Sequence, residues 1–159
     1  MTADSHHQRL RRLDRIFPRT PIYFVTACTA QRRPILASKT IHESFRVFAE
    51  TGADRGAWVG AYIVMPDHLH LFVTVDDQRI LLELWMKSLK NSLSKTLRRQ
   101  GVPAPHWQKT FFDHVLRSEE SYEEKWHYVR ENPRACRIGA ELERVAVRWR
   151  YFPLEHRRL

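Results

Sequence analysis

The sequence is poor in the residues that disulfide frameworks, zinc sites and nucleotide-binding loops require. Its 159 residues include two cysteines, Cys28 and Cys136, which are too few for a disulfide framework and lack a zinc-type spacing. No glycine-rich loop of the phosphate-cradling kind is present, which argues against a nucleotide cofactor. No apolar run approaches the roughly 20 residues of a membrane-spanning helix. No secretory hydrophobic region follows Met1. We therefore expect a cytoplasmic protein without a membrane partner.

Acidic residues are outnumbered by basic ones. The chain has 27 lysines and arginines against 18 aspartates and glutamates, a formal charge of +9. This excess favours a polyanionic partner such as nucleic acid. The candidate phosphate contacts fall in two groups, near the amino terminus and on a later helix: Arg9, Arg11, Arg12, Arg15, Lys87, Lys90, Lys95 and Arg98. Each of these side chains is equally compatible with a solvated basic face.

The chain length and the hydrophobic content of 43% predict one globular domain. We expect a basic arm over residues 1–20, a folded domain over 21–140 and a basic, aromatic tail over 141–159. The predicted strands are Ile22–Thr29, Ala57–Met65, His68–Val75 and Phe111–Arg117. The predicted helices are Thr40–Ala49, Ile80–Arg99 and Ser121–Asn132, with capping boxes at Thr40/Glu43 and Ser121/Glu124. This order predicts an α+β fold, a ferredoxin-like antiparallel β-sheet with helices packed on one face.

His68 and His70 are two residues apart on a predicted strand, so their side chains point to the same face of the sheet. The alternate positions form a fully apolar face that should bury against the helices: Leu69, Leu71, Val73 and Val75. Two neutral imidazoles supply half of a site for a divalent metal, and oxygen ligands would suit Mg²⁺ or Mn²⁺. A His-x-His pattern on a strand also arises by chance, so a third ligand must come from another element.

Tyr128 and Asn132 lie four residues apart on the last predicted helix and therefore share one face. They are separated by about 40° on the helical wheel and lie off the apolar stripe formed by Tyr122, Trp126 and Val129. Tyr128 is the candidate nucleophile and Asn132 the candidate third metal ligand. The alternatives are a surface tyrosine and an asparagine that ends the helix before Pro133.

Three runs of sequence, taken in order, resemble one family. They are Met65-Pro66-Asp67-His68-Leu69-His70, the segment 112–121, and Tyr128-Val129-Arg130-Glu131-Asn132-Pro133. Over roughly residues 20–140 the chain resembles the REP-associated tyrosine transposases, domesticated relatives of the single-tyrosine transposases of the HUH nuclease superfamily. The resemblance implies that residues 21–140 form an HUH single-tyrosine transposase domain. It matches His68 and His70 to the histidine pair, Tyr128 to the nucleophile and Asn132 to a third ligand that is glutamine in some relatives.

The resemblance also implies a reaction, a substrate and a location. The expected activity is metal-dependent cleavage and rejoining of single-stranded DNA through a 5′-phosphotyrosine, with Mg²⁺ or Mn²⁺ as cofactor. The expected partner is a hairpin formed by a short palindromic repeat, in the bacterial cytosol or nucleoid. The protein would act as a monomer or a homodimer.

Other functions fit parts of the same pattern. A metal-dependent hydrolase would use His68 and His70 to activate water and would not need Tyr128. A non-catalytic nucleic-acid binding module on a ferredoxin-like fold would need neither metal nor nucleophile. A rolling-circle replication initiator shares the chemistry, but the chain is short and has no helicase-like region.

Overall fold

A computed structural model describes residues 21–116 together with Glu124, Lys125 and His127. In chain order the elements are β1 (Ile22–Cys28), the 3₁₀ turn η1 (Ala30–Arg32), α2 (Lys39–Glu50), the 3₁₀ turn η2 (Ala53–Arg55), β2 (Ala57–Val64), β3 (His68–Val75), α3 (Leu82–Arg99) and β4 (Phe112–Leu116). All four predicted strands are present, and β3 has the predicted bounds. The arm over residues 1–20 and the tail over 141–159 lie outside the described residues.

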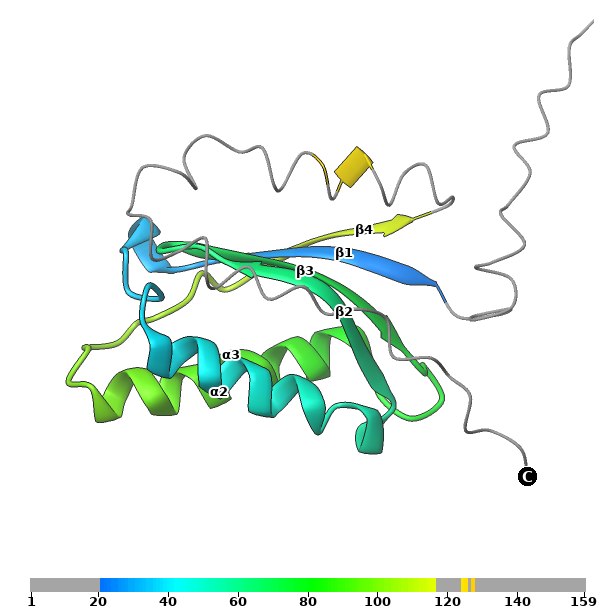
Figure 1. Cartoon of the computed structure of the whole chain (residues 1–159), viewed down its shortest axis with the longest axis horizontal. Helices are drawn as coiled ribbons and strands as arrows, with labels where there is room; N and C mark the ends of the chain where they lie inside the picture. Colours follow the sequence, from blue (N-terminus) through cyan, green and yellow to red (C-terminus); the bar gives the residue numbers. More distant parts are fainter. Residues whose placement is uncertain (1–20, 117–123, 126, 128–159) are drawn as a thin grey trace, which may run out of the picture.

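The four strands form one sheet in the order β2-β3-β1-β4, and every neighbouring pair is antiparallel. Helices α2 and α3 lie side by side against one face of this sheet (Figure 1). The predicted α+β fold, a ferredoxin-like antiparallel sheet with helices on one face, is confirmed. Because β3 lies between β1 and β2, any group on β3 is supported by strands on both sides.

The core lies between the sheet and the helix layer. Leu69, Leu71, Val73 and Val75 of β3 all belong to it, as the alternation in the sequence predicts. They meet side chains of the two helices, which include Ile41, Phe45, Trp85, Met86, Leu89 and Leu93. The intervening residues of β3 must therefore point to the opposite face, and His68 and His70 are among them.

The predicted capping box at Thr40 and Glu43 is wrong. Helix α2 begins one residue earlier, and the Oγ atom of Ser38 accepts a hydrogen bond from the backbone N–H of Ile41 at 3.2 Å. Ser38 has extended backbone angles, as an N-cap residue requires. Glu43 forms an ion pair with Arg46 one turn later instead.

Helix α3 begins at Leu82 rather than at the predicted Ile80. The backbone N–H of Ile80 donates to the carbonyl of Asp76 at 2.9 Å, in the turn that follows β3. Leu81 then has extended angles and precedes the helix. Of the predicted helix Ser121–Asn132, the structure describes Glu124, Lys125 and His127, which are helical. Ser121, the first residue of the capping box predicted for this helix, lies outside the described residues, as do Tyr128 and Asn132.

Candidate active site

His68 and His70 lie side by side on β3, on the sheet face that points away from the helices. Their ring centroids are 4.7 Å apart and the rings meet edge to face. The antiparallel register places Cys28 of β1 opposite His68 and Thr26 of β1 opposite His70. Both histidines are buried, so their surroundings hold them in defined positions.

His70 is held from β1 by two contacts. Its Nδ1 atom lies 2.7 Å from the hydroxyl oxygen of Thr26, and its ring stacks on that of Phe24 at a centroid distance of 5.4 Å. Burial, together with the charges of His68 and Arg32, lowers the pKa of His70 to about 4. His70 is therefore neutral near pH 7, which is the form of imidazole that binds a metal.

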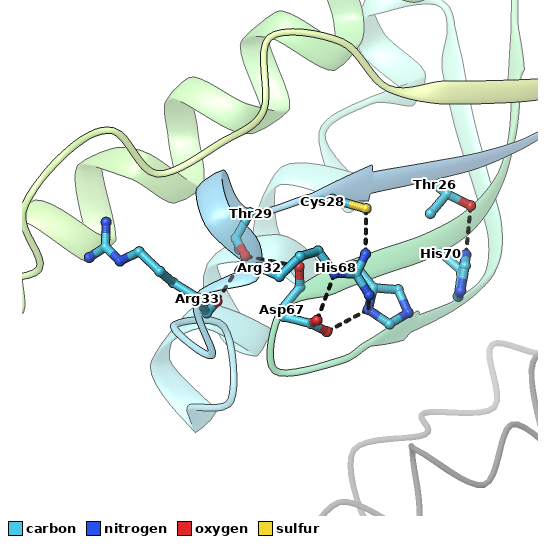
Figure 2. A network of polar contacts seen from close by, with 8 residues as sticks. All are labelled: Thr26, Cys28, Thr29, Arg32, Arg33, Asp67, His68 and His70. Atoms are coloured by element: carbon cyan, nitrogen blue, oxygen red, sulfur yellow. Dashed lines mark hydrogen bonds and ion pairs between the residues drawn. The ribbon is translucent and has the colours of Figure 1, made fainter.

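His68 is held by a chain of polar contacts that runs back to Arg32 (Figure 2). The Nδ1 atom of His68 lies 2.6 Å from the Oδ1 oxygen of Asp67. The other carboxylate oxygen of Asp67 accepts from the Nε atom of Arg32 at 2.8 Å. Burial alone would raise the pKa of Asp67, but the hydrogen bond from His68 and the charges of His68 and Arg32 lower it overall.

These contacts leave the Nε2 atoms of both imidazoles available. Among the described residues, every polar contact of the His68 and His70 rings involves Nδ1. Metal-binding histidines commonly have this arrangement, in which one ring nitrogen is fixed by a protein oxygen and the other binds the ion. The donor set fits one side of a divalent metal site.

The described part of the chain contains no group of three or more histidine, cysteine, aspartate or glutamate side chains that could hold a metal. The pair therefore needs at least one further ligand. Asn132, the predicted third ligand, and Tyr128, the predicted nucleophile, both fall outside the described residues. His114 of β4 is opposite Phe24 in the register, so it lies on the sheet face that carries His68 and His70, the histidine face. It is exposed and belongs to no group of potential metal ligands among the described residues.

The lysines and arginines predicted to contact DNA differ in their exposure and in their contacts with the protein. Lys87, Lys95 and Arg98 are exposed on α3, and the sheet lies between this helix and the histidine face (Figure 1). Lys90 is half-buried and its ammonium group donates to the carbonyls of Gln108 and Thr110 at 3.0 and 3.1 Å. Its most evident role is to fix the segment before β4. The four predicted arginines of the arm, Arg9, Arg11, Arg12 and Arg15, lie outside the described residues.

The sequence prediction missed the residues that support the histidines. Thr26 could have been found, because alternation along Ile22–Thr29 and pairing with the histidine strand bring it to the same face. Asp67 directly precedes His68 in the sequence, so its proximity to the histidine pair could also have been predicted. Arg32 gave no signal, because its position depends on the unusual backbone of η1.

The protein is a ferredoxin-like sheet that carries a supported histidine pair on a central strand. Comparison with known proteins identifies the family. The family described as "Transposase IS200 like" matches residues 20–131. The chain therefore belongs to the IS200-like transposases. Membership in this family supports the conclusion that the protein is a DNA-processing enzyme.

Three relatives illustrate how far the similarity extends. An uncharacterised protein of Haemophilus influenzae is 23% identical over an alignment of 164 positions, which spans 82% of this chain and 91% of the relative. The solved structure of a REP-associated tyrosine transposase bound to a REP hairpin superposes with a TM-score of 0.57 at 20% identity, over 71% of this chain and 66% of that one. A Deinococcus radiodurans protein assigned to the transposases gives a TM-score of 0.54 at 18% identity, over 70% and 89%. At these identities the two structures support the fold.

The structure also bears on membrane association. Within the described ranges, no helix is both long enough and apolar enough to cross a membrane.

The low pKa of His70 leads to a prediction about stability in the metal-free protein. Above pH 6.5, His70 is neutral in both the folded and the unfolded chain. As the pH falls from 6.5 towards about 4, the unfolded chain binds a proton that the folded protein does not, so stability decreases. The full effect amounts to up to about 3 kcal/mol.

Denaturant unfolding of wild type and His70→Gln between pH 7.5 and 4, with a chelator present, measures this effect. The difference in unfolding free energy between the two proteins should change across that window. Burial lowers the pKa of His42 as well, but His42 is present in both proteins and cancels. Parallel pH profiles would show that His70 does not titrate as described.

Proposed function

We propose that this protein is a single-tyrosine transposase of the REP-associated kind, which cleaves and rejoins single-stranded DNA. The observation that carries the proposal is the buried pair of His68 and His70, each with Nδ1 engaged and Nε2 available, in a chain of the IS200-like family. In this proposal the sheet supplies a rigid platform for a DNA phosphate. The nucleophile comes from the segment after β4.

The proposed metal site consists of His68, His70 and Asn132. Two imidazole nitrogens and an amide oxygen suit Mn²⁺ or Mg²⁺ when water or phosphate oxygens complete the coordination. When bound, the ion would polarise a non-bridging oxygen of the scissile phosphate and neutralise part of its charge. Thr26 and Asp67 would hold the two imidazoles in position for this ligand role.

Tyr128 is the proposed nucleophile. Its phenolate oxygen would attack the phosphorus in line, forming a bond to phosphorus while the bond from phosphorus to the 3′ oxygen breaks. The 3′ oxygen would leave and take up a proton, giving a free 3′-hydroxyl and a DNA strand attached to Tyr128 through its 5′ phosphate. Because the phosphate ester is retained, attack by a 3′-hydroxyl can reverse the step and rejoin DNA. A tyrosine phenol has a pKa of about 10 in water, so nearby positive charge must favour its ionised form.

The proposed substrate is a single-stranded hairpin formed by a palindromic repeat, of the type bound by the REP-associated relative. The cationic side chains would provide affinity through the phosphates, and the arm over residues 1–20 would read bases beside the stem. The chain covers just under two thirds of that relative, so this substrate is inferred from the family and the charge of +9.

End-labelled DNA tests the polarity of the reaction. With Mn²⁺ present, a hairpin labelled at its 3′ end should yield a labelled protein–DNA adduct that survives denaturation. The same hairpin labelled at its 5′ end should yield a shortened free strand. Cleavage with both ends released would indicate a metal-dependent hydrolase. Binding without any cleavage, and unaffected by metal, would indicate a non-catalytic binding module.

DNA affinity should fall steeply as the salt concentration rises. Each phosphate contact to a single strand contributes about 0.7 to the slope of log K against log salt. Two variants separate the two groups of cations: Arg9, Arg11, Arg12 and Arg15 all changed to Gln, and Lys87, Lys95 and Arg98 all changed to Gln. Removing the group that contacts DNA should lower the slope of log K against log salt, whereas removing the other group should leave that slope unchanged. Fluorescence anisotropy between 50 and about 300 mM salt measures it, and a flat slope in wild type would rule out the phosphate contacts.

A further inference from the structure

We propose that Arg32 is a positioning residue for the metal site, and that it acts through Asp67 to fix the orientation and tautomer of His68. The inference rests on the proposed function insofar as His68 binds a metal. The contacts that carry it lie within the described residues, and a property of the metal-free protein tests it separately.

The contacts form a continuous chain. Arg32 donates from Nε to Asp67 at 2.8 Å and from Nη1 to the Sγ atom of Cys28 at 2.8 Å. Asp67 in turn lies 2.6 Å from the Nδ1 atom of His68. The guanidinium therefore spans β1 and the turn before β3, with the imidazole at the end of the chain (Figure 2).

The distances also decide which contact sets the tautomer. The Nη2 atom of Arg32 lies 3.5 Å from Nδ1 of His68, which is much longer than the 2.6 Å contact of the same nitrogen with Asp67. The short contact places the proton on Nδ1, where it is donated to the carboxylate. A nitrogen that carries this proton cannot also accept from Arg32. Arg32 therefore acts on His68 by holding Asp67, and in the neutral imidazole with its proton on Nδ1 the Nε2 atom has a free lone pair.

The backbone of η1 is built to present Arg32. Gln31 and Arg32 have φ angles of 55° and 57°, in the left-handed region that residues with a Cβ atom seldom adopt. Two such residues in succession persist only where the surroundings enforce them, and they often mark functional sites.

Thr29 supplies part of this enforcement. Its backbone N–H donates to the carbonyl of Asp67 at 2.9 Å, and its hydroxyl is within hydrogen-bonding distance of the carbonyls of Asp67 and Arg33, at 3.0 and 2.8 Å. Thr29 is completely buried. The η1 turn and the turn that carries Asp67 therefore form one unit, and Arg32 closes it with its side chain.

Arg33 provides a matched control. It is adjacent in sequence and belongs to the same turn, but its side chain points away from the histidines (Figure 2). Its Nη1 atom donates to the carbonyls of Pro103 and Pro105 at 2.9 and 3.0 Å. Removing Arg33 deletes the same charge from the same turn without touching Asp67.

Mn²⁺ affinity separates positioning from simple charge. A nearby cation repels a metal ion, so if Arg32 acted by charge alone, Arg32→Gln would bind Mn²⁺ more tightly. If Arg32 holds Asp67 in place, the same substitution should weaken binding by about 10- to 100-fold. Arg32→Lys should also weaken it, because an ammonium group keeps the charge but cannot contact Asp67 and Cys28 with a planar fork. Arg33→Gln should change the affinity by less than about twofold.

A double-mutant cycle tests whether Arg32 acts through Asp67. In an Asp67→Asn background, adding Arg32→Gln should have little further effect on Mn²⁺ affinity, because the path to His68 is already broken. Electron paramagnetic resonance of free Mn²⁺ measures these affinities without relying on DNA cleavage. Additive losses would overturn the proposed path.

The metal-free protein gives the second readout. Long-range ¹H–¹⁵N spectra should show His68 with its proton on Nδ1 in wild type and Arg33→Gln, and a population shift towards the Nε2–H tautomer in Arg32→Gln. Unchanged tautomer and unchanged or tighter Mn²⁺ binding in Arg32→Gln would overturn the proposal, even if DNA cleavage decreased. If wild type bound no Mn²⁺, the proposed function would fail, and the spectra alone would decide the role of Arg32. Arg32 is half-exposed, so its variants should fold; if Arg32→Gln does not, Arg32→Lys takes its place.

Discussion

Changing Tyr128 to phenylalanine is expected to abolish the covalent protein–DNA adduct and to reduce strand cleavage by more than about 1000-fold. The substitution removes one oxygen atom, the atom proposed to attack the phosphate, and leaves the aromatic ring in place. Affinity for the hairpin should change by less than about threefold, since the cations rather than the phenol provide it. Adduct formation on denaturing gels and anisotropy with the same DNA give the two measurements.

Tyr122→Phe is the matched control for this experiment. It deletes the same atom six residues earlier, from a tyrosine that the sequence assigns to the apolar stripe of the same predicted helix. It should cleave like wild type. Cleavage by Tyr128→Phe at the wild-type rate would exclude the tyrosine mechanism and favour attack by an activated water molecule.

Replacing the histidine pair should have the second largest effect. The double variant His68→Ala, His70→Ala removes both proposed nitrogen ligands, and cleavage should fall by more than about 100-fold at saturating Mn²⁺. Each single variant should bind Mn²⁺ more weakly than wild type because one ligand is lost. It should still bind the ion, because the remaining imidazole keeps its own support from Asp67 or Thr26. Cleavage rates measured against Mn²⁺ concentration test both statements.

His114→Gln is the control for the histidine variants. His114 lies on the same face of the sheet but is exposed and outside any group of potential ligands in the described residues. Its loss should leave the Mn²⁺ dependence unchanged. Metal-dependent cleavage that survives in the double variant would show that the metal binds elsewhere.

Much of the fold could be predicted from local patterns. The apolar alternation on His68–Val75 determined both the strand and the face on which the histidines lie, since side chains on a strand alternate strictly. The two helices followed from their apolar stripes. Helix starts were less predictable, because several residues near an end can serve as the cap. At α2, Ser38 forms the cap in place of Thr40.

The support of the site could not be predicted to the same extent. The contact between Arg32 and Asp67 joins residues 35 positions apart and depends on two left-handed backbone conformations. The two left-handed residues are a glutamine and an arginine, and neither type favours that conformation. No sequence rule would therefore place the Arg32 side chain beside Asp67. The basic spacing on α3 was visible in the sequence. The packing of the layers was needed to show that this helix lies on the face of the sheet opposite to the histidines (Figure 1).

This layered arrangement limits where DNA can bind. A DNA strand bound at His68 and His70 would lie on one side of the sheet. Lys87, Lys95 and Arg98 belong to α3, in the helix layer on the other side. These cations can contribute only if the DNA extends around an edge of the sheet. The two salt-dependence variants distinguish such wrapping from binding by the arm alone.

The most direct test of the proposed mechanism is to identify the residue that carries the DNA. Wild-type protein is incubated with the single-stranded hairpin and Mn²⁺, digested with protease and nuclease, and analysed by tandem mass spectrometry. A tyrosine mechanism predicts a peptide in which Tyr128 carries a 5′-linked nucleotide through a phosphodiester. Cleaved DNA without any modified peptide, or a nucleotide attached to a residue other than Tyr128, would contradict it.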